Sequence, residues 1–278
     1  MPHKQLAAFA TDFVVLRRLL TEGEEAIVRG DDVSVRVGLL QVDLAAEMLM
    51  KAGLRFYGER PDPRSDLSKL IEAVNVAAKR EVVDDANALL TLRKMRNTVM
   101  HDGIQQESGT AHTNAIRARD AMRRVASQVF GVDLANLHLG EFISSEQIRS
   151  LLGEASKYFD SEQYREAVGY ALAAFDQLMY AWTAYNQKLF DLREPPSDKF
   201  ARIIGTLSAG VYLPSLQRFR EATDRIHAQV TAGGKVFLSY TGMLDNPVEM
   251  EKRARYALDF VGGLALQIEA RLGGRRAW

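Results

Sequence analysis

A basic side chain, an amide and an imidazole lie close together in the segment LLTLRKMRNTVMHDG, which ends at Gly103. Arg96, Asn97 and His101 follow one another there in the order Arg-Asn-x-x-x-His. A neutral imidazole can take a proton from a hydroxyl group and, once charged, return a proton to a leaving oxygen. A guanidinium group can bind a phosphate and offset charge that develops on it. These residue types therefore predict acid–base chemistry at a phosphate, with Asn97 forming hydrogen bonds beside it.

The spacing of these residues predicts a single helix that stops at Gly103. Helical geometry places Arg93, Asn97 and His101 at i, i+4 and i+8, along one line of the surface, with Arg96 at the edge of that face. The opposite face carries an apolar stripe that would anchor the helix, composed of Leu92, Met95 and Val99. An Arg and a His in the last turn also satisfy free carbonyls and the helix dipole, so a purely structural role stays open.

The order Arg-Asn-x-x-x-His before a glycine resembles the signature of the HEPN family of helical RNA-cleaving domains, over the stretch from Asp31 to Phe130. The resemblance implies a metal-independent endoribonuclease without a cofactor, in which the ribose 2′-hydroxyl attacks the phosphate and leaves a cyclic phosphate. The implied catalytic residues are Arg96, Asn97 and His101. Family members act as dimers with two motifs facing each other across one cleft, which implies a homodimer here.

Further residues are candidates for the same site. Glu47 matches a position that is often acidic in HEPN domains, where it would orient Arg96 or His101, but an ordinary surface glutamate is the alternative. Basic side chains near the motif could follow an RNA backbone through phosphate contacts. Solvated helix faces carry similar runs of charge, so this second interpretation remains open. The basic candidates are Arg93, Lys94, Arg117, Arg119, Arg123 and Arg124.

The composition indicates an ordinary globular protein. The chain has 278 residues, of which 47% are hydrophobic and 26% charged, enough for one large domain or two of average size. The formal net charge of zero argues against RNA contact over a wide surface but not against a local basic cleft. Cysteine is absent, which excludes disulfides and thiolate metal sites. No His pair has metal-ligand spacing, no signal peptide or membrane span is recognisable, and we expect a cytoplasmic protein.

Hydrophobic periodicity predicts an all-α protein made of two tandem up-and-down bundles, residues 1–131 and 144–278, joined by a connection at 131–144. The resemblance implies that both bundles are HEPN-like. Gly30 ends the first helix, and Asp31 and Asp32 can cap the next one, which closes at Gly53. Its apolar stripe is formed by Val33, Val37, Leu40, Leu44 and Met48. Ser65 caps the next helix, and Asp84 and Asp85 start the motif helix. Ser144 with Gln147 forms a capping box. Later helices are predicted at 145–158, 162–189, 198–208, 214–231 and 247–272. The segment 233–244, GGKVFLSYTGML, has strand character and predicts a loop or small hairpin.

The two halves resemble each other weakly, as an internal duplication would. Glu25–Ala52 aligns with Glu154–Ala181, and Glu47 then meets Asp176. Further along, Arg220 takes the place of Arg96. This similarity favours a duplicated bundle, although amphipathic helices also match one another by chance.

The second half departs from the motif, because Glu221 and Arg225 stand where the Asn and the His would be. His227 follows Arg220 by seven residues, and two turns of helix would put both side chains on one face. We therefore expect a degenerate copy, with Arg220 and His227 as a candidate second site.

Two functions follow from these patterns. The first is a ribonuclease that acts as a toxin or in defence against phage, with RNA as its substrate and an antitoxin or another defence-system protein as a partner. The second is a non-catalytic helical interaction module or scaffold, which the zero net charge and the degenerate second half favour. A bundle that binds a nucleotide or another small ligand is a third alternative.

Overall fold

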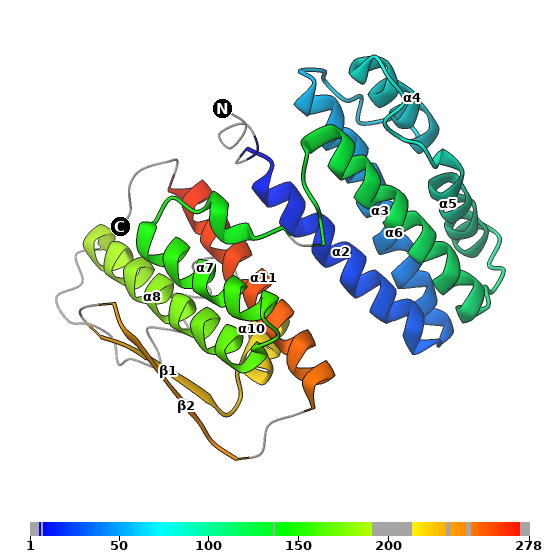
Figure 1. The fold of residues 1–278 in the computed structure, drawn as a ribbon. Helices are drawn as coiled ribbons and strands as arrows, with labels where there is room; N and C mark the ends of the chain where they lie inside the picture. Colours follow the sequence, from blue (N-terminus) through cyan, green and yellow to red (C-terminus); the bar gives the residue numbers. More distant parts are fainter. Residues whose placement is uncertain are drawn as a thin grey trace. The chain divides into compact units, whose positions relative to one another are not determined.

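The computed structural model describes residues 6, 8–135, 137–190, 213–231, 234–242 and 246–272, with the side chains of 186–190 excepted. The chain forms two compact units, residues 1–137 and 138–278. Apart from one two-stranded hairpin, the elements in the described part are helices (Figure 1), so the predicted all-α class is confirmed. None of the helices in the described ranges combines the length and the hydropathy that a membrane span requires.

Unit 1 is a bundle of helices arranged around α3. Its helices are α2 (Ala10–Arg29), α3 (Asp32–Phe56), α4 (Leu67–Ala78), α5 (Ala86–His101) and α6 (Ser108–Phe130). Helix α3 contacts each of the other four, and it runs between α2 on one side and α4 and α5 on the other (Figure 1). This central position makes α3 the support on which the motif helix α5 rests.

The helix ends of unit 1 follow the signals in the sequence. The Asp31 carboxylate accepts a hydrogen bond from the Ser34 amide at the start of α3, and Asp85 accepts one from the Ala88 amide at the start of α5. Gly30 ends α2 in the left-handed conformation, with φ at 81°. The predicted starts of α3 and α5 are therefore confirmed.

Helices α2 and α3 approach each other closely at two glycines. A Cβ atom on Gly38 would lie 2.5 Å from the carbonyl oxygen of Gly23. Helix α2 continues through Gly23 without interruption. The absence of side chains at these two positions lets the two backbones come into contact.

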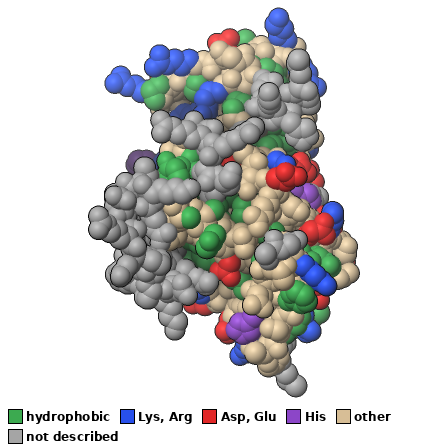
Figure 2. Space-filling view, turned by 90° about the vertical axis from the view of Figure 1, so that its left-hand side faces the viewer, with side chains coloured by type: hydrophobic (Ala, Val, Ile, Leu, Met, Phe, Trp, Pro, Cys, Tyr) green, Lys and Arg blue, Asp and Glu red, His purple; other side chains and the backbone are tan. Residues whose placement is uncertain are grey.

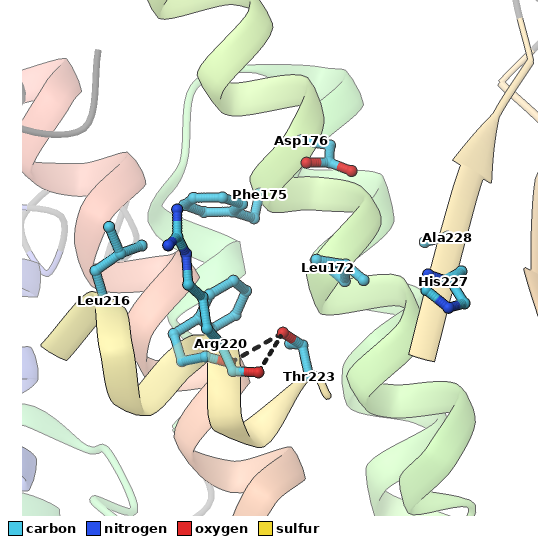
Figure 3. A pocket seen from close by; sticks show the side chains of 9 residues that line it. Leu172, Phe175, Asp176, Leu216, Arg220, Thr223, His227 and Ala228 are labelled. Carbon is cyan, nitrogen blue, oxygen red and sulfur yellow. Dashed lines mark hydrogen bonds between the residues drawn. The ribbon is translucent and has the colours of Figure 1, made fainter. Parts of the chain in front are cut away.

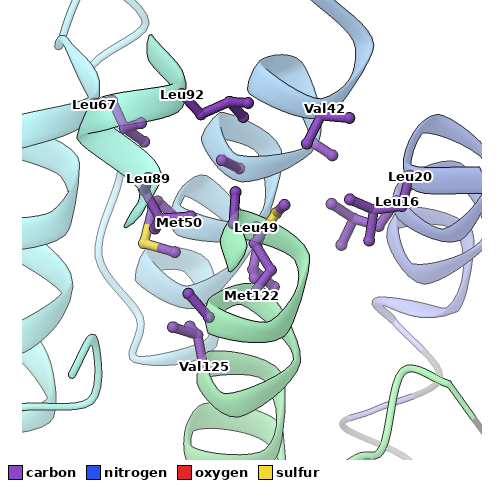
Figure 4. Packing of buried hydrophobic residues seen from close by; sticks show 14 of the residues in the cluster. Leu16, Leu20, Val42, Leu49, Met50, Leu67, Leu89, Leu92, Met122 and Val125 are labelled. Carbon is purple, nitrogen blue, oxygen red and sulfur yellow. The ribbon is translucent and has the colours of Figure 1, made fainter. Parts of the chain in front are cut away.

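Side chains from all five helices of unit 1 meet in one hydrophobic core (Figure 4). The predicted apolar stripe of α5, at Leu92, Met95 and Val99, is buried in it, which confirms that prediction. The labelled members of this core include Leu16, Leu20, Leu49, Met50, Leu67, Leu89, Met122 and Val125.

Helix α3 differs from its prediction in the face that it buries. Val33, Val37 and Leu44 are 68%, 43% and 47% exposed, and the buried face is instead formed by residues such as Leu39 and Leu49. The helix has apolar residues on two faces, and the predicted stripe lies mostly on the face that is exposed to solvent. The helix also continues to Phe56 rather than closing at Gly53, and Asp66 rather than Ser65 caps α4.

Unit 2 combines helices with a hairpin. Its elements are η1 (Leu139–Phe142), α7 (Glu146–Asp160), α8 (Tyr164–Phe190), α10 (Leu213–Ala222), β1 (Ile226–Val230), β2 (Val236–Tyr240) and α11 (Pro247–Arg271). Helix α8 contacts α7, α11 and both strands, and the hairpin runs along it (Figure 1). Gly169 of α8 permits this contact, because a Cβ atom there would lie 2.7 Å from the Leu238 side chain of β2.

The hairpin corrects the prediction of one helix over 214–231. Helix α10 ends at Ala222, Arg225 has a left-handed φ of 67°, and Ile226 begins strand β1. Residues 226–230 pair antiparallel with 236–240, in the segment for which strand character was predicted. Pairing with this later segment and packing on α8 outweigh the local helical pattern of 226–231. The helix predicted at 198–208 lies outside the described residues.

The segment predicted as a connection, 131–144, is packed. Val132 and Leu134 are buried in unit 1, and Leu139 and Ile143 are buried in unit 2. The hydrogen bonds at the end of this segment also differ from the predicted capping box of Ser144 and Gln147. The Ser145 hydroxyl caps α7, whereas the amide and hydroxyl of Ser144 donate to the carboxylate of Glu269 on α11.

Candidate functional site

The motif residues occupy the last two turns of α5. The Arg96 guanidinium donates through Nη1 to Asn97 Oδ1 at 2.7 Å, and its side chain is 30% exposed. His101 is the last residue of the helix and is exposed. Across the described residues, its imidazole has no hydrogen-bond or ion-pair partner. The structure thus places a partly buried, oriented guanidinium and a solvent-accessible imidazole on the same end of one helix.

A buried aspartate of α3 supports this end of α5. Asp43 Oδ1 accepts a hydrogen bond from Arg93 Nε, and Asp43 Oδ2 lies 3.7 Å from Arg96 Nε. The Asp43 side chain is only 5% exposed. One carboxylate therefore faces two arginines of α5, which fixes their orientation relative to α3.

Sequence reasoning missed Asp43. A signal was present, because Asp43 precedes Glu47 by four residues and both lie on the line of α3 that faces Arg93. Glu47 itself accepts hydrogen bonds from Arg93 Nη2 at 3.0 Å and from Lys51 Nζ at 2.6 Å. The acidic neighbour of Arg96 in the structure is thus Asp43, and Glu47 acts on Arg93.

Burial and ion pairing shift the two carboxyl groups in opposite directions. Burial raises the pKa of Asp43 above its ordinary value, although hydrogen bonding and attraction from Arg93 and Arg96 oppose this. Burial also raises the pKa of Glu47, but hydrogen bonds from Lys51 and Arg93 outweigh it and leave that pKa below its ordinary value.

The basic candidates differ in what they contact. The Arg93 guanidinium is engaged by Asp43 and Glu47, and Arg119 by Glu24 and Asp120, at 2.9 and 3.0 Å. The candidates Lys94 and Arg117 are exposed. On the face drawn in Figure 2, basic side chains are interspersed with acidic ones.

The Arg96 side chain is 30% exposed, so its guanidinium can still receive an anion from solvent. Its Nε is buried and, among the described residues, lacks a hydrogen-bond partner, because 3.7 Å to Asp43 is too long for a hydrogen bond. Asn97 uses its Oδ1 for Arg96, which leaves the Nδ2 donors directed elsewhere. Asn97 and His101 are one turn apart, about 6 Å along the helix axis. A phosphate bound at Arg96 and Asn97 would therefore have His101 within one nucleotide's reach.

Metal ligation has no candidate in the parts of the chain that the structure describes, because no group of three or more His, Asp or Glu side chains is positioned to hold an ion.

The second candidate pair lies in unit 2, around a pocket of about 390 Å³ (Figure 3). Arg220 comes from α10 and His227 from strand β1, so the prediction that they share one helix face is wrong. Both residues nevertheless line the pocket, together with Asp176 of α8. The remaining lining residues are Leu172, Phe175, Leu216, Phe219, Thr223 and Ala228.

Comparison of the chain with models of protein families, with curated proteins and with solved structures found no match.

Proposed function

We propose that unit 1 is a HEPN-like endoribonuclease that cuts RNA at the end of α5. The observation that carries the proposal is the state of Arg96: it is oriented by Asn97 and Asp43, its side chain is 30% exposed, and His101 is exposed about one turn beyond. The Nε itself is buried towards Asp43, so a bound phosphate oxygen would contact the guanidinium from the side of the Arg96 side chain that is exposed.

In the proposed reaction His101 in its neutral form takes the proton of a ribose 2′-hydroxyl. The 2′-oxygen attacks the neighbouring phosphorus, and the bond from phosphorus to the 5′-oxygen breaks. The protonated imidazole then gives a proton to the leaving 5′-oxygen. Arg96 and the Asn97 amide stabilise the charge that develops on the phosphate. None of these steps requires a metal ion or a cofactor.

The proposed active form is a homodimer. Unit 2 carries Glu221 and Arg225 where the motif has its Asn and His. A cleft formed by two complete motifs therefore needs unit 1 from two chains. In this form the protein would act as a toxin or a phage-defence effector, held in check by an antitoxin or another partner protein.

The test is cleavage of RNA by the purified protein and two variants, Arg96→Ala and His101→Ala. Each should lower the cleavage rate at least about a hundredfold, because each removes a group that acts on the reacting atoms. Lys69→Ala is the matched control, since Lys69 is an exposed basic residue of the same unit, on α4, and is not a candidate for the site. Circular dichroism should show unchanged helix content. Cleavage by His101→Ala at the rate of the parent would end the proposal.

The second candidate function is a non-catalytic interaction module. The observation that favours it is the exposed apolar set on α3, formed by Val33, Val37 and Leu44, because exposed apolar clusters are typical of surfaces that contact other proteins. Growth of cells that express the protein separates the two functions. A ribonuclease toxin slows growth far more than its His101→Ala form, whereas an interaction module affects growth equally in both forms.

A further inference from the structure

Strand β2 of unit 2 has an edge that no other strand covers in the described part of the chain. The sheet formed by the described residues consists of β1 and β2 alone, and Figure 1 shows it at the margin of unit 2. The outer edge of β1 is partly occupied, because the Ile226 amide donates to the carbonyl of Thr223 at 3.1 Å. A free edge presents unpaired N–H and C=O groups to another strand. We propose that the β2 edge pairs antiparallel with the β2 edge of a second copy of this chain.

The pairing with β1 determines which backbone groups of β2 face the free edge. The Thr231 amide donates to the Lys235 carbonyl at 3.0 Å, and the Thr241 amide donates to the Arg225 carbonyl at 2.9 Å. Hydrogen-bonded pairs alternate with non-hydrogen-bonded pairs along an antiparallel ladder, so every second residue of β2 points its N–H and C=O away from β1. These outward residues are Val236, Leu238 and Tyr240. Within the described ranges, no backbone hydrogen bond outside the hairpin reaches them.

A second copy fits this edge best in one register. When the two strands are centred on Leu238, each outward residue meets an outward residue of the other copy, Val236 against Tyr240 and Leu238 against Leu238. Each of these pairs exchanges two hydrogen bonds. A shift by two residues leaves one outward residue of each copy unpaired, and a shift by one leaves all of them unpaired. The edge is thus self-complementary, as the contact of a two-fold dimer must be.

The side chains of β2 do not protect this edge. Its sequence, VFLSY, contains no charged residue and no proline, the usual means of keeping other strands away. The ammonium group of Lys235 lies 5.0 Å from the centre of the Phe237 ring, and in the proposed register Lys235 stands opposite Thr241, so like charges do not meet. Phe237 is 51% exposed and would lie beside Ser239 of the second copy, which covers part of its ring.

Disulfide cross-linking of the full chain locates the contact, which is independent of RNA cleavage by unit 1. A dimer mass alone would not locate it, since unit 1 is proposed to form a dimer of its own. The chain contains no cysteine, so the variants Phe237→Cys and Ser239→Cys carry one thiol each. In the proposed register these two positions form a non-hydrogen-bonded pair with Cα atoms about 4.5 Å apart, a separation that a disulfide spans.

Oxidation of an equal mixture of the two variants should give almost entirely the heterodimer, identified by mass spectrometry. Random encounter gives only as much heterodimer as the two homodimers together. That random ratio, or the absence of cross-linked product, would overturn the proposal.

Proline substitutions test the backbone of the edge. Val236→Pro, added to both cysteine variants, removes an outward N–H that β1 does not use, and it should lower the yield of heterodimer at least about tenfold. Val230→Pro is the matched control, because Val230 is the partner of Val236 in the hairpin and its N–H faces the opposite edge of the sheet. Circular dichroism should show unchanged helix content for both. An unchanged yield with Val236→Pro, or an equal loss with both prolines, would contradict the assignment.

Discussion

Replacement of Arg93 by Gln tests how α5 is held on α3. The Arg93 side chain is 19% exposed and donates to Asp43 at 2.5 Å and to Glu47 at 3.0 Å. Breaking a buried ion pair from one side costs about 3–5 kcal/mol, because the remaining charge stays buried. Two features lower this value for Arg93→Gln: Arg96 still lies 3.7 Å from Asp43, and part of Arg93 contacts water. We expect a loss of about 2–3 kcal/mol in the unfolding free energy of unit 1.

A second substitution measures the interaction between Arg93 and Asp43 separately from the effect of each residue alone. The weak alignment of the two halves sets Leu172 of unit 2 against Asp43 and Gln217 against Arg93. Adding Asp43→Leu to the Arg93→Gln variant removes the carboxylate that has lost its partner. The resulting pair, a leucine and a glutamine, is the one that unit 2 has at Leu172 and Gln217. The double variant should therefore lose at least about 1 kcal/mol less than the sum of the two single variants, as residues in direct contact do.

Urea-dependent hydrogen exchange of peptides from α3 and α5, followed by mass spectrometry, measures the unfolding of unit 1 by itself. Arg124→Gln is the matched control. Arg124 pairs with Asp84 in the same unit, but their side chains are 44% and 42% exposed, so its loss should cost less than about 1 kcal/mol. Equal losses for Arg93→Gln and Arg124→Gln, or strict additivity in the double variant, would refute the reasoning.

Two further predictions concern packing and pH. Gly38→Ala should destabilise unit 1 by about 1–3 kcal/mol in urea denaturation, because its Cβ would meet the backbone oxygen of Gly23, whereas Gly109→Ala at the open start of α6 should not. Glu47 has a folded-state pKa below its ordinary value of 4.5, so its contribution to stability is present above pH 4.5 and is lost as the pH falls through the folded pKa. Glu47→Gln should therefore show a smaller loss of unfolding free energy on acidification than the parent, and an equally steep loss would contradict the assigned ion pairs.

Local signals in the sequence predicted the motif helix well. A capping aspartate at Asp85, the buried stripe of α5 and the stop before Gly103 are all short-range features, and the structure contains each of them. Strand character at 236–240 was likewise visible in its residues, as β2 confirms.

Features that depend on distant parts of the chain could not be predicted in the same way. The helical pattern of 226–230 gave way to pairing with β2. Helix α3 has two apolar faces, and only its neighbours decide that Val33 is exposed and Leu39 buried. The spacing of Asp43 and Glu47 is visible in the sequence, but the pairing of Asp43 with Arg93, 50 residues away, follows only from the packing of α3 on α5.

The chemistry at the end of α5 is tested most directly by the ends of the RNA fragments that the purified protein produces in the presence of a metal chelator. Attack by a ribose 2′-hydroxyl predicts 2′,3′-cyclic phosphate and 5′-hydroxyl ends, identified by mass spectrometry, from the parent and not from His101→Ala. Fragments with 3′-hydroxyl and 5′-phosphate ends, or the same cyclic ends at equal yield from His101→Ala, would contradict the proposed role of Arg96 and His101.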